Sequence, residues 1–296
     1  MTARRLSQCI ALSLAGLTWW VMVSRPGAVG SEFVVEIHAA LAVLVAVFFG
    51  LSFVSLRFAT TGSTIYWTPN GTDQIRQIVW LALATLGTML AAEVVLTRLG
   101  WSGPTAAKIT YLLAGTLIPA AFLQFGLIAW PDRSSYPERL RLLLISGLAI
   151  GLAAAWSYAG WSAAPDEAVF PSVPELIVIM GAVLVGATFE EIVFRVLLLT
   201  SLVDRTGSRF QAVFLSGVAF GLMHVPGAVL EPLLHGDWAF FQQAAFEYAP
   251  LFLLQTFLGL LLGVLWLRTG SITLIALTHA TLNMGKALGE GLLPYG

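Results

Sequence analysis

Two adjacent glutamates lie within a stretch of the sequence that otherwise predicts a membrane-spanning helix. The stretch reads GAVLVGATFEEIVFRVLLL and holds Glu190, Glu191 and Arg195 near its centre. On insertion scales, a charged side chain in the middle of a span costs about 2.5 to 3.5 kcal/mol. These charges are therefore candidates for a functional role.

Their spacing predicts different roles for the two glutamates. Glu191 and Arg195 are four residues apart and share a helical face, so an ion pair between them is expected. Glu190 lies about 100° further round the helix and can point elsewhere in the bundle. A carboxylate in that position could act as a general base or acid. A purely structural network of all three residues is the alternative.

Two later apolar segments carry further polar residues at a spacing of four. In FGLMH, Phe220 and His224 share a face just before Pro226, where a histidine also fits a structural hydrogen bond at a helix end. In SITLIALTHATLN, His279 and Asn283 share a face. They could pair with each other across a turn or donate hydrogen bonds to a developing oxyanion.

Depth in the membrane favours a common role for these side chains. At ~1.5 Å per helical residue, Glu190, His224, His279 and Asn283 all fall between the middle and the outer half of a bilayer, counted from the predicted cytoplasmic helix ends. Scattered structural residues have no reason to share one layer.

The composition predicts an integral membrane protein. The chain has 296 residues, of which 58% are hydrophobic and 10% charged, and its mean hydropathy is +0.85. So few polar residues cannot cover the surface of a soluble globule. Lipids are thus expected partners, whereas a net charge of -1 predicts no nucleic-acid partner. The single cysteine, Cys9, excludes an intramolecular disulfide and a cysteine-based metal site.

The predicted fold class is all-α, a polytopic membrane bundle of about eight to nine transmembrane helices. Candidate spans lie near 6–24, 34–56, 76–97, 106–130, 140–163, 175–202, 210–226, 250–267 and 271–289. We divide the chain into an N-terminal region of about five spans, 1–174, without an assigned role, and a motif-bearing core, 175–287.

Basic residues in alternate loops predict the orientation. A cytoplasmic N-terminus places ten arginines on the cytoplasmic side: Arg4, Arg5, Arg57, Arg76, Arg133, Arg139, Arg141, Arg205, Arg209 and Arg268. The opposite side then holds only Arg25, Arg98, Lys108 and Lys286. The expected location is the plasma membrane of a prokaryote, with the first segment as an uncleaved span.

The ordered set EExxxR, FxxxH and HxxxN, each on a separate apolar segment, resembles the CPBP family of intramembrane proteases. That family includes type II CAAX prenyl endopeptidases and bacterial bacteriocin-processing and self-immunity proteins. The resemblance covers roughly residues 175–287 and involves Glu190, Glu191, Arg195, Phe220, His224, His279 and Asn283.

The resemblance implies hydrolysis of a peptide bond in a membrane-associated protein or peptide. It implies that Glu190 and His224 activate water, that His279 and Asn283 stabilise the oxyanion, and that Glu191, Arg195 and Phe220 support them.

The expected mechanism uses no cofactor. A zinc ion held by Glu190, His224 and His279 is the alternative, since two histidines and one carboxylate can leave a position for water. No HExxH pair lies on one helix, which favours the glutamate mechanism. The alternative function is non-catalytic: the protein would be an immunity factor or a transporter that uses the same polar pocket for binding.

Overall fold

The computed structural model describes residues 2–23, 34–70, 74–100, 104–162, 172–225 and 238–290. Its helices are α1 (Ala3–Val23), α2 (Val34–Thr60), α3 (Gln74–Arg98), α4 (Pro104–Gln124), α5 (Arg139–Ser162), α6 (Val173–Glu191), the π-helix η1 (Ile192–Leu199), α7 (Thr200–Thr206), α8 (Arg209–Met223), α10 (Trp238–Thr269) and α11 (Ile272–Glu290). Since α6, η1 and α7 are continuous, these ranges form nine helical rods, and each overlaps one predicted span.

The apolar runs form helices because a helix satisfies its own backbone hydrogen bonds in lipid. Within the described residues, five helices are long and apolar enough to cross a membrane: His38–Thr60, Gln74–Leu96, Arg139–Ala159, Val173–Thr206 and Glu247–Thr269. The segments Ile109–Gln124 and Arg209–Met223 are shorter apolar helices. The predicted all-α polytopic membrane fold is confirmed.

One helix extends well beyond its predicted span. The sequence predicts a span near 250–267, but α10 already begins at Trp238 and carries Pro250 in its interior. A proline inside a membrane helix is tolerated where neighbouring groups satisfy the carbonyl that it leaves unbonded.

The chain divides into two compact units, and the first comprises Met1–Ser63 and Leu202–Val264. In this unit α1 packs against α2, and both contact α8. A methyl group at Gly217 of α8 would lie 2.7 Å from Leu260 Cδ2, and one at Gly259 would lie 2.7 Å from the Gly217 Cα. The α8 and α10 backbones therefore cross in close contact, which small residues permit in membrane bundles.

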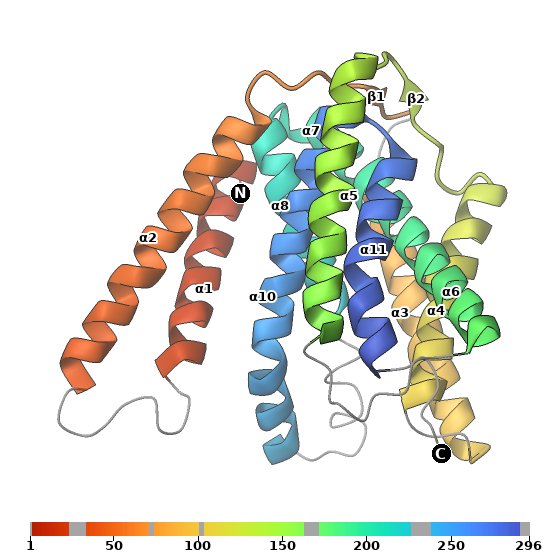
Figure 1. The fold of residues 1–296 in the computed structure, drawn as a ribbon, viewed down its shortest axis with the longest axis horizontal. Coiled ribbons are helices and arrows are strands. Elements are labelled where there is room, and N and C mark those ends of the chain that lie inside the picture. The colour runs from red at the N-terminus through yellow and green to blue at the C-terminus, as the bar shows by residue number, and fades with distance from the viewer. Residues whose placement is uncertain are drawn as a thin grey trace. The chain divides into compact units, whose positions relative to one another are not determined.

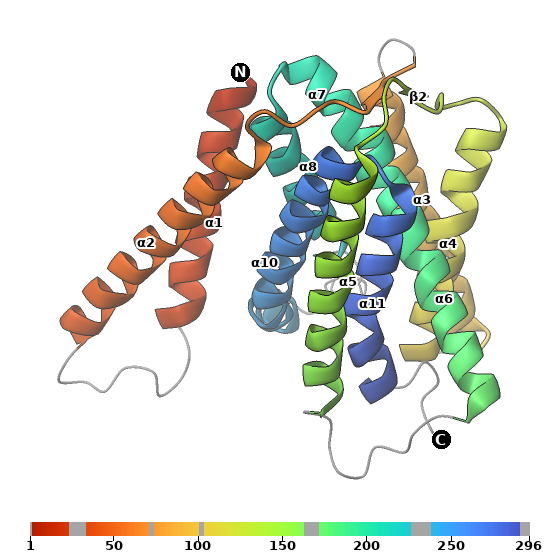
Figure 2. The ribbon, with the colours of Figure 1, turned by 45° about the horizontal axis from the view of Figure 1, so that its top comes forward.

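The second unit comprises Thr64–Ser201 and Leu265–Gly296. Here α11 lies between α5 and α6, as Figures 1 and 2 show from two directions. The α5–α11 contact is close, because a methyl group at Gly285 would lie 2.8 Å from the Ser157 Cα. This packing brings α11 beside the end of α6 that carries the glutamates.

A buried apolar cluster joins three other helices of the second unit. Its members are Ile78 and Leu81 of α3, Leu197 of η1, and Ile128, which follows α4 in the chain. Phe122 of α4 packs against this cluster. The helix α3 therefore contacts η1, and α4 contacts both α3 and α6. This cluster holds α4 against the rod that carries the glutamates.

Three turns of the second unit meet at one end of it. Strand β1 (Trp67–Thr68) pairs antiparallel with β2 (Asp132–Arg133). The Trp67 indole N–H donates to the Gly270 carbonyl over 2.9 Å. Gly270 separates α10 from α11 with a φ of 56°, a left-handed conformation that glycine adopts readily.

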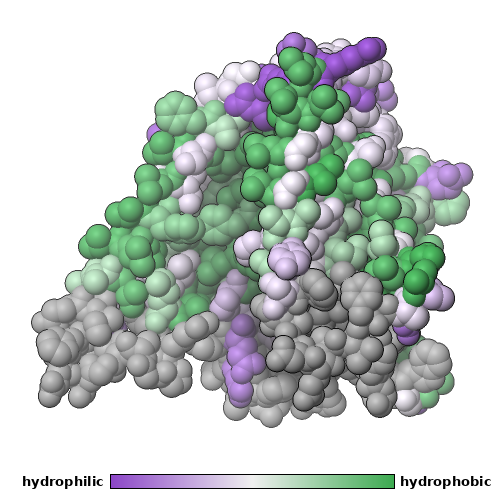
Figure 3. All heavy atoms as spheres, in the orientation of Figure 1, coloured by the Kyte–Doolittle hydropathy of each residue, from purple (hydrophilic) through white to green (hydrophobic). Residues whose placement is uncertain are grey.

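The outward face of α5 is apolar. Most of the described side chains on the face drawn in Figure 3 are hydrophobic. Along α5 the outward leucines are each at least 61% exposed: Leu140, Leu143, Leu144, Leu148 and Leu152. Such a row of exposed leucines fits contact with lipid rather than with water.

Candidate active site

Glu191 and Arg195 form the ion pair that their spacing predicts. The Arg195 Nη1 lies 3.1 Å from the Glu191 Oε1, and both side chains are 0% exposed. Glu191 is the last residue of α6, and Arg195 follows in η1. Because neither charge reaches solvent, each depends on the other for compensation.

A third group reaches the same carboxylate from α11. The His279 Nδ1 lies 2.8 Å from the Glu191 Oε1, and His279 is 1% exposed. A carboxylate accepts hydrogen bonds, so the ring donates through Nδ1–H. Glu191 thereby orients the His279 ring as well as neutralising Arg195.

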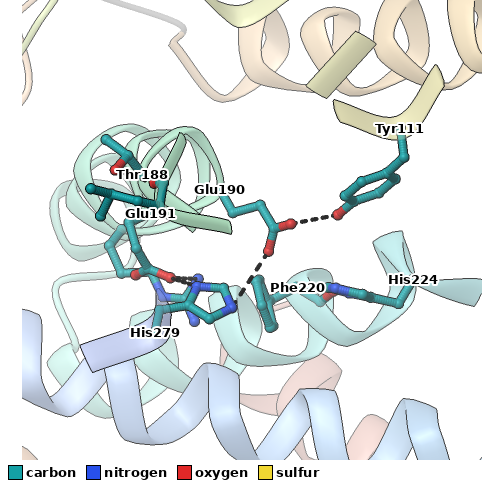
Figure 4. Close-up of polar contacts among 9 residues, drawn as sticks. Tyr111, Thr188, Glu190, Glu191, Phe220, His224 and His279 are labelled. Carbon is teal, nitrogen blue, oxygen red and sulfur yellow. Dashed lines mark hydrogen bonds and ion pairs between the residues drawn. The ribbon is translucent and has the colours of Figure 1, made fainter. Parts of the chain in front are cut away.

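Glu190 points in a different direction from its neighbour, as Figure 4 shows. Its Oε1 accepts a hydrogen bond from the Tyr111 hydroxyl over 2.6 Å, and its Oε2 lies 3.8 Å from the His279 Nε2. The side chain remains 16% exposed, whereas that of Glu191 is fully buried. Of the two glutamates, Glu190 is the partly exposed one, although its Oε2 itself is buried.

His279 thus lies between two carboxylates, with one ring nitrogen facing each. The Nδ1–H donates to Glu191, whereas Nε2 lies 3.8 Å from the Glu190 Oε2, which is beyond hydrogen-bond distance. Glu191, Arg195 and His279 thus form one buried polar cluster, and Glu190 lies at its edge.

Phe220 and His224 belong to the first unit. The His224 Nδ1 lies 2.8 Å from the Phe220 carbonyl oxygen, so Nδ1 carries the proton and Nε2 is the acceptor nitrogen. The Phe220 ring is 0% exposed and meets the imidazole at a centroid distance of 4.8 Å. The spacing of four thus holds the His224 ring on its own helix.

Asn283 stands one helical turn beyond His279 on α11 and is half-buried. The second unit thus brings Glu190, Glu191, Arg195 and His279 together, with Asn283 on the same helix as His279.

Sequence reasoning missed Tyr111, which lies in the N-terminal region without an assigned role. A half-buried tyrosine in an apolar helix needs a partner for its hydroxyl, and this was the available signal.

The donor types fit a zinc ion as well as they fit metal-free hydrolysis. The Glu191–His279 contact is of the kind that orients metal-ligating histidines, and His279 would then offer Nε2 to the metal. Across the residues that the structure describes, no group of three or more His, Cys, Asp or Glu side chains has the arrangement of a metal site.

The long apolar helices and the inward-facing charged residues define an integral membrane protein. Residues 172–285 match the family model of the type II CAAX prenyl endopeptidases, Rce1-like. The resemblance inferred from the three motifs is therefore confirmed over these residues, and the match supports a membrane-embedded protease of the CAAX type. No curated protein and no solved structure matches the chain.

Proposed function

We propose that the chain is an endopeptidase in which Glu190 and His224 activate the attacking water. The supporting observation is the division between the two glutamates: Glu191 is fully buried against Arg195 and His279, while Glu190 remains partly exposed. A partly exposed glutamate near His279 is a better candidate for a general base than one held by a buried arginine.

In the proposed reaction, a water molecule transfers a proton to Glu190 and its oxygen attacks the scissile carbonyl carbon. His224, whose acceptor nitrogen is Nε2, then takes this proton from Glu190 and delivers it to the leaving amine nitrogen, which restores the Glu190 carboxylate. Collapse of the tetrahedral intermediate then breaks the C–N bond and leaves a carboxylic acid and an amine.

The oxyanion of that intermediate needs hydrogen-bond donors, and we assign this role to His279 and Asn283. The imidazolium form of His279 has an Nε2–H, and its Nδ1–H is held by Glu191. Asn283 offers an amide N–H₂ one turn further along α11. Loss of one such donor lowers kcat by roughly 10²- to 10³-fold in proteases.

We further propose that the mechanism uses no metal. This proposal is favoured because no HExxH pair, the ligand spacing of many zinc proteases, lies on one helix. Were zinc bound, Glu190, His224 and His279 would hold it, and it would supply an acidified water. Zinc that co-purifies stoichiometrically with the wild-type chain but not with H279A would contradict the metal-free mechanism.

The test is a cleavage assay in membranes containing the full chain. The probes are an internally quenched peptide ending in a prenylated CAAX sequence and the total membrane proteins, whose new N-termini are labelled. We expect E190Q and H224A each to lower cleavage by at least ~10²-fold, the usual contribution of general acid–base groups. Undiminished cleavage in both variants would refute the assignment. Absence of any cleavage, with a retained peptide-binding phenotype, would favour the non-catalytic alternative.

A further inference from the structure

We infer that Tyr111 is a positioning residue that holds Glu190 ready to act as the base. This inference rests on the proposed function, because it assigns Tyr111 a role through Glu190. Tyr111 lies in α4, outside residues 172–285 that match the protease family. The inference therefore gives the N-terminal region a part in the reaction.

The contact is direct and short. The Tyr111 hydroxyl donates to the Glu190 Oε1 over 2.6 Å. Hydrogen bonds of 2.5 to 2.7 Å are typical of a hydroxyl donating to an ionised carboxylate, and they are about twice as strong as neutral ones. Tyr111 is thus a direct hydrogen-bond partner of the carboxylate that is proposed to act as the base.

The helices around this contact hold the hydroxyl in place. A methyl group at Gly186, one turn before Glu190 on α6, would lie 3.6 Å from the Leu112 Cδ1, so α4 and α6 touch beside Tyr111. Further along α4, Phe122 packs against the buried cluster that includes Leu197 of η1. The distance from Tyr111 to Glu190 is therefore set by packing of whole helices.

The hydrogen bond also selects one conformation of Glu190. A glutamate side chain has three rotatable bonds, and fixing such a chain costs up to about 2 kcal/mol of conformational entropy. With Oε1 held by Tyr111, Oε2 is directed toward the His279 Nε2. The oxygen that would take a proton from water is thus oriented before substrate arrives, a form of preorganisation.

The matched variants are Y111F and Y158F. Each removes one hydroxyl and keeps the ring, but Tyr158 lies on α5 and is 65% exposed. With the quenched CAAX peptide, we expect Y111F to lower kcat by roughly 10- to 100-fold and to change KM by less than about twofold, as for a misplaced catalytic group. Y158F is expected to retain the wild-type values.

An infrared measurement on the full chain in nanodiscs separates positioning from a general structural effect. The carboxylate stretching band that disappears in E190Q belongs to Glu190. This band is expected to shift in Y111F and to stay in place in Y158F, with both melting temperatures near that of the wild type. A catalytic defect caused only by loosened packing would leave the band unshifted.

The outcomes distinguish the two proposals. If E190Q is inactive but Y111F keeps the wild-type kcat, or if the Glu190 band does not move in Y111F, the role of Tyr111 is refuted and the proposed function stands. If E190Q remains active, Glu190 is not the base, and both proposals fall. A reduced kcat in Y111F with a shifted band supports the positioning role.

Discussion

The Glu191 Oε1 lies 2.8 Å from the His279 Nδ1 and 3.1 Å from the Arg195 Nη1, so one buried oxygen serves a histidine and an arginine together. The two partners come from different parts of the chain, since Arg195 is one turn away and His279 lies 88 residues further on. Glu191 therefore has a structural role, because it joins α11 to α6 through the hydrogen bond with His279.

Exchanging each glutamate for glutamine is expected to separate stability from activity. E191Q leaves the buried Arg195 without its carboxylate, and breaking a buried ion pair in this way costs about 3 to 5 kcal/mol. E190Q removes a partly exposed charge and is expected to melt near the wild-type temperature while losing cleavage. Thermal unfolding in detergent, followed beside the cleavage assay, measures both. A stable E191Q or an unstable E190Q would reverse the roles assigned to the two residues.

The close crossing of α11 and α5 predicts a strong effect at Gly285. A side chain at this position would enter the space of the Ser157 backbone, with 2.8 Å between the new methyl carbon and the Ser157 Cα. Overpacking of this kind costs about 1 to 3 kcal/mol, and we expect G285A to lower the melting temperature by roughly 2 to 10 °C. The matched control is G151A on α5, where nothing lies within 4 Å of the added methyl group. Equal melting temperatures for the two variants would show that the helices do not cross this closely.

The orientation with a cytoplasmic N-terminus predicts which loops an impermeant reagent can reach. Three turns that it assigns to the cytoplasmic side meet in the structure, through β1, β2 and the Trp67 bond to Gly270. Their meeting supports a shared side of the membrane, while the basic residues indicate which side it is.

Cysteine labelling tests this orientation. Because Cys9 is the single cysteine, a C9S background allows single reporters at two exposed positions, L99C and E138C. An impermeant maleimide is expected to label L99C in intact cells and E138C only after permeabilisation. The opposite pattern would invert the topology, and labelling of both in intact cells would contradict the number of spans between them.

The sequence by itself determined the helices and the local pairs. Apolar runs long enough to cross a membrane form helices here, because a helix satisfies the hydrogen bonds of its own backbone in lipid. The Glu191–Arg195 pair and the Phe220–His224 contact follow from a spacing of four on one helix. These features depend on neighbours within one turn, and periodicity is enough to find them.

Only the tertiary structure decided the partners that come from distant helices. Tyr111 and Glu190 are 79 residues apart, and their hydrogen bond depends on how α4 packs against α6. The position of His279 between the two carboxylates depends likewise on α11 entering between α5 and α6. Side-chain spacing within a helix carries no information about which helices become neighbours. The motif therefore indicated two carboxylates with different roles. The packing of α4 showed that Tyr111 bonds Glu190, and the packing of α11 showed that His279 bonds Glu191.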